Sequence, residues 1–224
     1  MNVRRRRLRG FLHDNGLSLV LFGLFFLMLV GQAVAGFAAH DDELRAHGEP
    51  SIDFAIYLSS GHFIEAVFEN WESEFLQMGA LVVFTIFLRQ KGSPESKPEG
   101  GKEPQDEEPR TRPDTPWPVR RGGLVLGIYQ HSLSIALFVL FAGSLVLHAF
   151  GGTAEYNEEQ REHGEAAVSL AEFVGSSEFW FQSLQNWQSE FLSAGSLVIL
   201  SVYLRQRGSP ESKPVDAPHV ETGT

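Results

Sequence analysis

The chain carries two copies of one sequence, 116 residues apart. Residues 70–98 read NWESEFLQMGALVVFTIFLRQKGSPESKP and residues 186–214 read NWQSEFLSAGSLVILSVYLRQRGSPESKP, with 19 of these 29 positions identical. The same offset pairs His47-Gly48-Glu49 with His163-Gly164-Glu165 without a gap. Because chance does not produce agreement of this extent, the chain consists of two units of roughly 85 residues joined by a linker.

Each unit contains two apolar stretches. Leu17–Ala39 is 23 residues long without a charge, enough to cross a bilayer core of about 30 Å as a helix. The other three stretches are residues 71–88, 132–150 and 187–204. The pattern predicts an all-α polytopic membrane protein with four transmembrane helices, forming two tandem-repeat hairpins. Since two spans return the chain to its starting side, both hairpins have the same orientation, unlike the inverted repeats of many secondary transporters.

Composition divides the chain into four parts. Residues 1–91 and 122–207 are the two membrane repeats, and residues 92–121 form the linker between them. Seven of the eleven prolines lie between Gly92 and Pro118 among mixed charges. Such a segment buries too little apolar area to offset the entropy of ordering, so we expect it to be disordered. The tail, residues 208–224, starts with the same pattern and is expected to behave alike.

Charge predicts the orientation. With a cytoplasmic N-terminus, 16 of the 18 Lys and Arg residues lie inside, and only Arg45 and Arg161 lie in the outer loops. This satisfies the positive-inside rule at every inner end. We therefore expect a multi-pass protein of the bacterial cytoplasmic membrane with both termini in the cytoplasm. The alternative for the first span is a cleaved leader ending at Ala33-Val34-Ala35, but the equivalent mid-chain segment 132–150 is not a leader.

Short polar signals predict where the helices begin and end. Gly48 and Gly164 are suited to end the polar helical segments that precede them, and Asn157 is suited to begin the second of those segments. Ser60 and Ser176 are expected to cap second helices of about 28 residues that continue into the membrane.

The shared N-W-x-S-E-F-L segment supplies the main candidate site. On a helix its polar positions fall within about 100° of arc, and Glu74 and Glu190 then lie about one turn below the tryptophan belt. A carboxylate inside hydrocarbon is costly and normally faces protein or water. One interpretation is a pair of glutamates that binds a proton or a cation. The other, which is favoured, is that both glutamates are solvated near the start of their helices. The candidate intramembrane cluster is Asn70, Ser73, Glu74, Gln77, Asn186, Ser189, Glu190 and Ser193.

Other polar residues of the spans have structural interpretations. Gln32 and His148 occupy equivalent positions and are expected to hydrogen-bond to neighbouring helices. Trp71 and Trp187 are expected at the outer interface, and Arg89 and Arg205 at the inner one.

No cofactor or metal is expected. His13, His40, His131 and His148 superficially resemble two haem sites, but the depths of the pairs do not match. His40, Asp41, Asp42 and His47 are possible metal ligands, for which a solvated acidic loop is the favoured interpretation. The absence of cysteine removes thiolate chemistry and disulfides.

The sequence excludes several classes of function. No catalytic or nucleotide-binding fingerprint occurs, and a net charge of −10 argues against nucleic acid as a partner. We expect a non-enzymatic protein that acts through assembly, with the lipid bilayer and a second copy or another membrane protein as partners. The alternative is a small proton- or ion-coupled channel or carrier using Glu74 and Glu190. A membrane redox protein is a third and weaker hypothesis.

The segments N-W-E-S-E-F-L-Q-M, S-S-G-H-F-I-E-A and N-G-L-S-L-V resemble an uncharacterised bacterial family of integral membrane proteins of unknown function. The resemblance covers both repeats and implies membrane placement and a bacterial source. It transfers no catalytic residue. The second copy departs from it at 176–181, which reads SSEFWF.

The predicted topology makes a direct forecast for reporter fusions. Alkaline phosphatase, which is active only outside the cytoplasm, should be active when fused after residue 50 or residue 165 and inactive when fused after residue 105. Activity of the fusion at residue 105 would contradict the topology.

Overall fold

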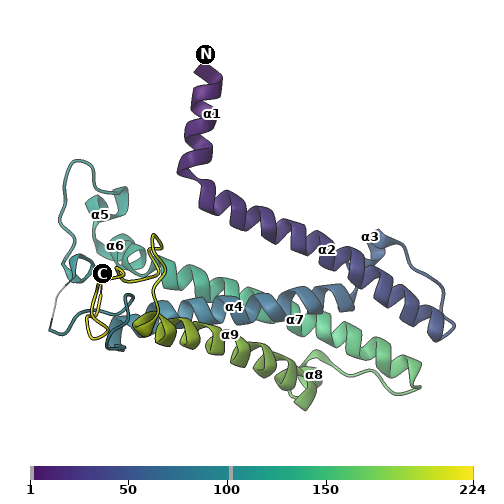
Figure 1. Cartoon of the computed structure of the whole chain (residues 1–224). Helices are drawn as coiled ribbons and strands as arrows, with labels where there is room; N and C mark the ends of the chain where they lie inside the picture. Colours follow the sequence, from purple (N-terminus) through teal and green to yellow (C-terminus); the bar gives the residue numbers. More distant parts are fainter. Residues whose placement is uncertain (1–2, 101–102, 224) are drawn as a thin grey trace.

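The computed structural model describes residues 3–100 and 103–223, and within these residues it is all-α, as the sequence predicts. Figure 1 shows the long helices, with shorter ones near their ends. The long helices are α2 (Gly16–Ala46), α4 (Gly61–Phe87), α7 (Ser132–Glu162) and α9 (Ser177–Tyr203). The shorter ones are α1 (Val3–Asp14), α3 (Phe54–Tyr57), η1 (Pro104–Asp106), α5 (Trp117–Arg121), α6 (Gly123–Gln130) and α8 (Leu170–Val174).

Two helices of the described chain, α2 and α7, are long and apolar enough to cross a membrane. Each has 31 residues, and only 6% and 17% of their most apolar windows are buried inside the structure. The N-terminal halves of α4 and α9 carry carboxylates and amides, which lower their hydropathy. That these two helices also span the membrane stays a prediction.

The bounds of the long helices recur at the 116-residue offset, because equivalent residues begin and end them. Ser60 Oγ accepts a hydrogen bond from the Phe63 N–H, and Ser176 Oγ accepts one from the Phe179 N–H, each at 3.3 Å. The predicted serine caps are thus confirmed, and each capped helix has 27 residues. Gly48 (φ +79°) and Gly164 (φ +72°) follow the ends of α2 and α7 in the left-handed conformation predicted for them.

The predicted helix start at Asn157 is wrong. The residue lies inside α7, which continues from its apolar part into the polar segment without a break. The Asn157 side chain instead bonds to the backbone of Val168, accepting from its N–H at 2.7 Å and donating to its carbonyl at 3.0 Å. A side chain suited to capping caps only where the helix breaks, and nothing interrupts the hydrogen-bond ladder here.

The chain bends at the start of each unit. α1 and α2 meet at Asn15, and α6 and α7 meet at the equivalent residue His131. Both residues leave helical geometry, with φ −120° at Asn15 and φ −114° at His131. Figure 1 shows α1 turned sharply away from the axis of α2. These bends mark where α2 and α7 begin as straight helices.

The principal helix contact joins the two units. α4 runs antiparallel to α7 along most of its length, with α9 packed beside α4 (Figure 1). The contact is close at the end where α4 begins, called the outer end below, because Gly61 lies against Gly151 and Ala154 of α7. Farther along, Gly79 lies against Phe138. The two units are therefore interlocked through α4 and α7, whereas α2 contacts α4 at few points.

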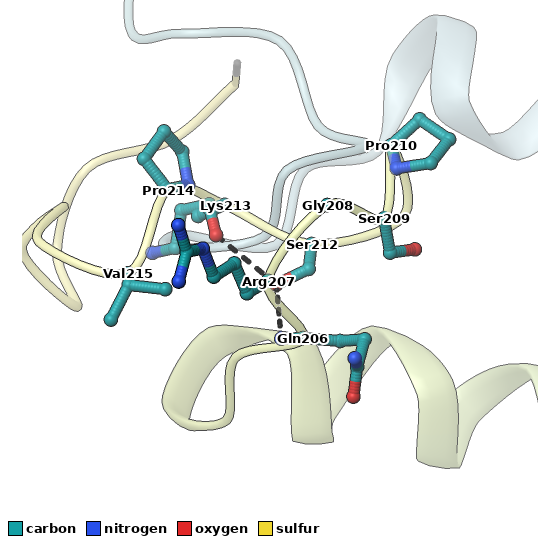
Figure 2. Close-up of a pocket in the computed structure, with 9 residues that line it drawn as sticks. All are labelled: Gln206, Arg207, Gly208, Ser209, Pro210, Ser212, Lys213, Pro214 and Val215. Carbon is teal, nitrogen blue, oxygen red and sulfur yellow. Dashed lines mark hydrogen bonds between the residues drawn. The ribbon is translucent and has the colours of Figure 1, made fainter.

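The segments that follow α4 and α9 adopt the same turn. Ser96 Oγ accepts from the Gln90 N–H at 3.0 Å, and Ser212 Oγ accepts from the Gln206 N–H at 2.9 Å, the bond drawn in Figure 2. Beyond the second turn, the Lys213 ammonium donates to the carbonyls of Pro218, His219 and Glu221. The division into four parts and the disorder of residues 92–121 and 208–224 stay predictions, and residues 1–2, 101–102 and 224 of those parts lie outside the described residues.

The glycine contact between α4 and α7 can be tested with one methyl group. A Cβ added at Gly151 meets the Glu65 backbone nitrogen at 2.6 Å, whereas one added at Gly143 of the same helix meets nothing within 4 Å. We expect Gly151→Ala to destabilise the protein by about 1–3 kcal/mol, as overpacking does. Gly143→Ala should be neutral or stabilising by up to about 1 kcal/mol. Unfolding in mixed detergent micelles measures both, and equal effects would contradict the close contact.

Candidate functional site

A single carboxylate joins three helices in the interior. Glu72 of α4 has an exposed fraction of 0%. Its Oε1 accepts from the Ser183 hydroxyl at 2.8 Å and from the Trp187 indole N–H at 3.1 Å, both on α9. Its Oε2 lies 3.1 Å from Nδ1 of His148 on α7. A buried carboxylate needs partners of this kind, because a charge left unpaired in the interior is costly.

His148 is the imidazole partner of that carboxylate. Its ring is also fully buried and stacks on Phe179, with the centroids 4.9 Å apart. Its Nε2 lies 3.2 Å from Oε1 of Gln182, whose amide N–H₂ donates to Glu178. Both ring nitrogens therefore face oxygen acceptors, the arrangement that a doubly protonated imidazolium satisfies. The geometry is that of a buried carboxylate–imidazolium pair.

Two more carboxylates lead from the pair toward the outer end of α4. Glu65 and Glu69 precede Glu72 by seven and three residues, so all three lie on one face of the helix. Both are half-buried and interact with amides of α9, Glu65 with Gln182 and Glu69 with Asn186. The α4–α9 interface is thus polar along its outer half and connects the acidic outer end with the buried pair.

The residues of the cluster predicted from the sequence lie outside the buried pair. Glu74 is exposed and Glu190 half-buried, and the two lie near enough to repel each other. The hydroxyls of the cluster bond within their own helices, Ser73 to the Asn70 carbonyl, Ser189 to the Asn186 carbonyl and Ser193 to the Glu190 carbonyl. Asn70 and Asn186 also donate to carbonyls one turn back, and Gln77 is half-buried. Among the described residues no hydrogen bond joins two members of this cluster across the helices, although Asn186 interacts with Glu69 of α4.

The remaining sequence candidates do contact other elements. Gln32 of α2 donates to the Ala66 carbonyl of α4 at 3.3 Å, while the equivalent His148 pairs with Glu72. Trp71 packs against Phe25 of α2, and the equivalent Trp187 donates to Glu72.

The basic residues expected at the inner interface follow the C-terminal ends of α4 and α9, and their place at a membrane boundary stays a prediction. Arg89 pairs with Glu99 at 3.3 Å. Arg205 donates to backbone carbonyls at the end of α9 and in the tail, among them Ser201, Leu204 and Ala217.

Sequence reasoning selected Glu74 and missed Glu72 for an identifiable reason. It favoured carboxylates present in both copies, and the equivalent of Glu72 is Gln188. The informative signal was a difference between the copies at a position that is polar in both. Glu72 and His148 are each replaced by glutamine in the other copy, at Gln188 and Gln32, so both positions are polar in both copies and charged in only one.

The profile of the DUF6766 family, described as a domain of unknown function, matches residues 8–224. The chain belongs to this family. No curated protein and no solved structure matches the DUF6766 chain. Family membership therefore agrees with the resemblance to an uncharacterised family and assigns no activity.

The pairing of Glu72 with His148 in this DUF6766 protein predicts non-additive substitutions. His148→Gln leaves the buried carboxylate without its cation and should destabilise the protein by about 3–5 kcal/mol. Adding Glu72→Gln removes the unpaired charge, so the double variant should be more stable than His148→Gln alone. Unfolding in mixed micelles measures this coupling, with Glu74→Gln as an exposed control expected within about 0.5 kcal/mol of the parent. Additive effects would show that the two side chains are not paired.

Proposed function

We propose that the protein is a non-enzymatic, multi-pass membrane protein in which the Glu72–His148 pair binds and releases a proton, as part of a small proton-coupled channel or carrier. Its four spans are α2, α4, α7 and α9. The observation that carries the proposal is the fully buried ionisable pair held by three helices. Ionisable groups within membrane spans are rare and mark ion pathways and proton relays.

The depth of the pair follows from the bend at His131. If the straight part of α7 begins at the inner boundary, His148 lies 16 residues above Ser132, or about 24 Å. A hydrocarbon core of about 30 Å then places the pair inside the membrane, about 6 Å from the outer boundary. Glu65, seven residues and about 10 Å farther out on α4, reaches that boundary.

Access to the pair is one-sided in this conformation. The carboxylates Glu65 and Glu69 form a polar path to it from the acidic outer end. On the inner side, α4 becomes apolar only after Glu74 and Gln77, and Gly79 then lies closely against Phe138. A proton therefore enters from the outer side, and its passage to the cytoplasmic side requires α4 and α9 to separate below Glu72. The orientation used here, with both termini in the cytoplasm of a bacterium, follows from the distribution of basic residues.

A second candidate function is assembly with another copy of the chain or another membrane protein. The observation that favours it is the unequal packing of α2 and α7, which are equivalent in the two units. α7 packs along α4, whereas α2 leaves its apolar surface almost fully exposed. Lipid or a partner helix covers that surface in a membrane.

Proton flux into proteoliposomes tests the first candidate. Purified protein should collapse an imposed pH gradient, followed with an enclosed pH-sensitive dye, faster than protein-free vesicles do. Glu72→Gln removes the proton-binding carboxylate and should return the rate to that of the empty vesicles.

The matched control is the double variant Glu74→Gln with Glu190→Gln, which changes carboxylates outside the buried pair and should retain the flux. The reverse result, with flux lost only in the double variant, would assign the site to Glu74 and Glu190. No flux in the parent protein would overturn the proton-coupled function and favour assembly.

A further inference from the structure

Three side chains from three helices converge at the outer end of the molecule. They are His40 of α2, His62 of α4 and Glu155 of α7, and each offers a ligand atom within 4.8 Å of those of the other two. His40 and His62 have ring centroids 5.0 Å apart. Of the residues that the sequence suggested as metal ligands, His40 alone belongs to this cluster. The other two members are brought to it by the packing of α4 on α7.

The cluster contains polar atoms that are buried and unpaired in the described part of the chain. His40 is 5% exposed, and its Nδ1 has no hydrogen-bond partner there. Oε2 of Glu155 is also buried without a partner. Leaving such atoms unsatisfied costs about 1–3 kcal/mol each, and more for charged groups. Two buried atoms of metal-binding type without a partner, on two members of one cluster, indicate that a ligand completes it.

Tyr57 contacts both histidines of this cluster. The residue is 1% exposed, and its hydroxyl lies 3.1 Å from Nδ1 of His62. Its ring also packs against those of His40 and Phe37. Burial and the negative charge of Glu155 raise the pKa of the Tyr57 hydroxyl, which keeps the phenol neutral. A bond to one ring nitrogen fixes the orientation of the imidazole and leaves its other nitrogen for a ligand, the usual support of a metal-binding histidine.

We propose that His40, His62 and Glu155 bind one divalent transition-metal ion of the Zn²⁺ class. Two imidazoles and one carboxylate form a donor set that suits Zn²⁺ and Co²⁺, whereas Mg²⁺ and Ca²⁺ prefer oxygen ligands alone. Three protein ligands leave a fourth, tetrahedral position for water. Nearby carboxylates, among them Glu43 and Glu65, add negative charge around the cation.

The described residues hold this site once, because the two units supply different ligands. The repeat-equivalent residues of His40, His62 and Glu155 are Tyr156, Glu178 and Ala39, and this second set has no histidine. Two ligands come from the first unit and one from the second. A metal ion at this position joins α2, which has few other contacts, to the α4–α7 pair.

Metal binding by the purified full-length protein tests the proposal, with any polyhistidine tag removed and the sample stripped of metal. Equilibrium dialysis should give one Zn²⁺ or Co²⁺ per chain, and bound Co²⁺ should show the visible absorption of a tetrahedral site. His62→Gln and Glu155→Gln each remove one ligand and should weaken binding at least tenfold. Tyr57→Phe, which removes only the supporting bond, should weaken it less.

His163→Gln is the matched control, because it removes an exposed histidine of the second unit. It should bind the metal as the parent does, and circular dichroism should show equal helix content in every variant. Glu72→Gln should also retain binding, which separates this test from that of the proton site. Absence of stoichiometric binding in the parent, or unchanged affinity in both His62→Gln and Glu155→Gln, would overturn the proposal.

Discussion

The close approach of α4 and α7 is the contact on which the rest of the structure depends. At its outer end it is a contact of backbone against backbone, since Gly61 and Gly151 leave no side chain between the helices. This approach brings Glu72 into reach of His148 and brings Glu155 to the two histidines of the first unit. One glycine contact therefore positions both the buried pair and the outer cluster, and both combine residues from the two units.

Differences between the two copies explain why each site occurs once among the described residues. Two identical units packed through α4 and α7 would place the same side chains at both equivalent positions. The two units differ at the positions of the ionisable residues. Gln188 is aligned with Glu72, and Gln32 is aligned with His148. Glutamine preserves hydrogen bonding between helices but carries no charge and exchanges no proton. The second unit therefore supplies the imidazole, hydroxyl and indole that hold the fully buried carboxylate of Glu72.

The unequal packing of α2 and α7 is the main departure from the symmetry that the repeat suggests. α7 packs along α4 and contributes a residue to both polar sites, whereas α2 meets α4 chiefly through Gln32, Phe25 and its outer end. His40 lies at that outer end and is nearly fully buried. A ligand bound there holds α2 at the point where its own contacts are most concentrated, which links the metal site to the arrangement of the bundle.

The sequence by itself determined the helical class, the two apolar helices α2 and α7, the serine caps of α4 and α9, and the recurrence of helix bounds. These features depend on composition and on spacing within a few residues, so they can be recognised along the chain. The start expected at Asn157 failed because a continuous hydrogen-bond ladder overrode a local preference.

Only the tertiary structure decided which polar side chains meet. Glu72 and Glu74 are two residues apart, so at about 100° per residue they point to nearly opposite faces of α4. The sequence shows that the segment is helical but does not show which face is turned inward. That depends on the rotation of α4 against α7, which is set where Gly61 meets Gly151, and this rotation buries Glu72 and exposes Glu74.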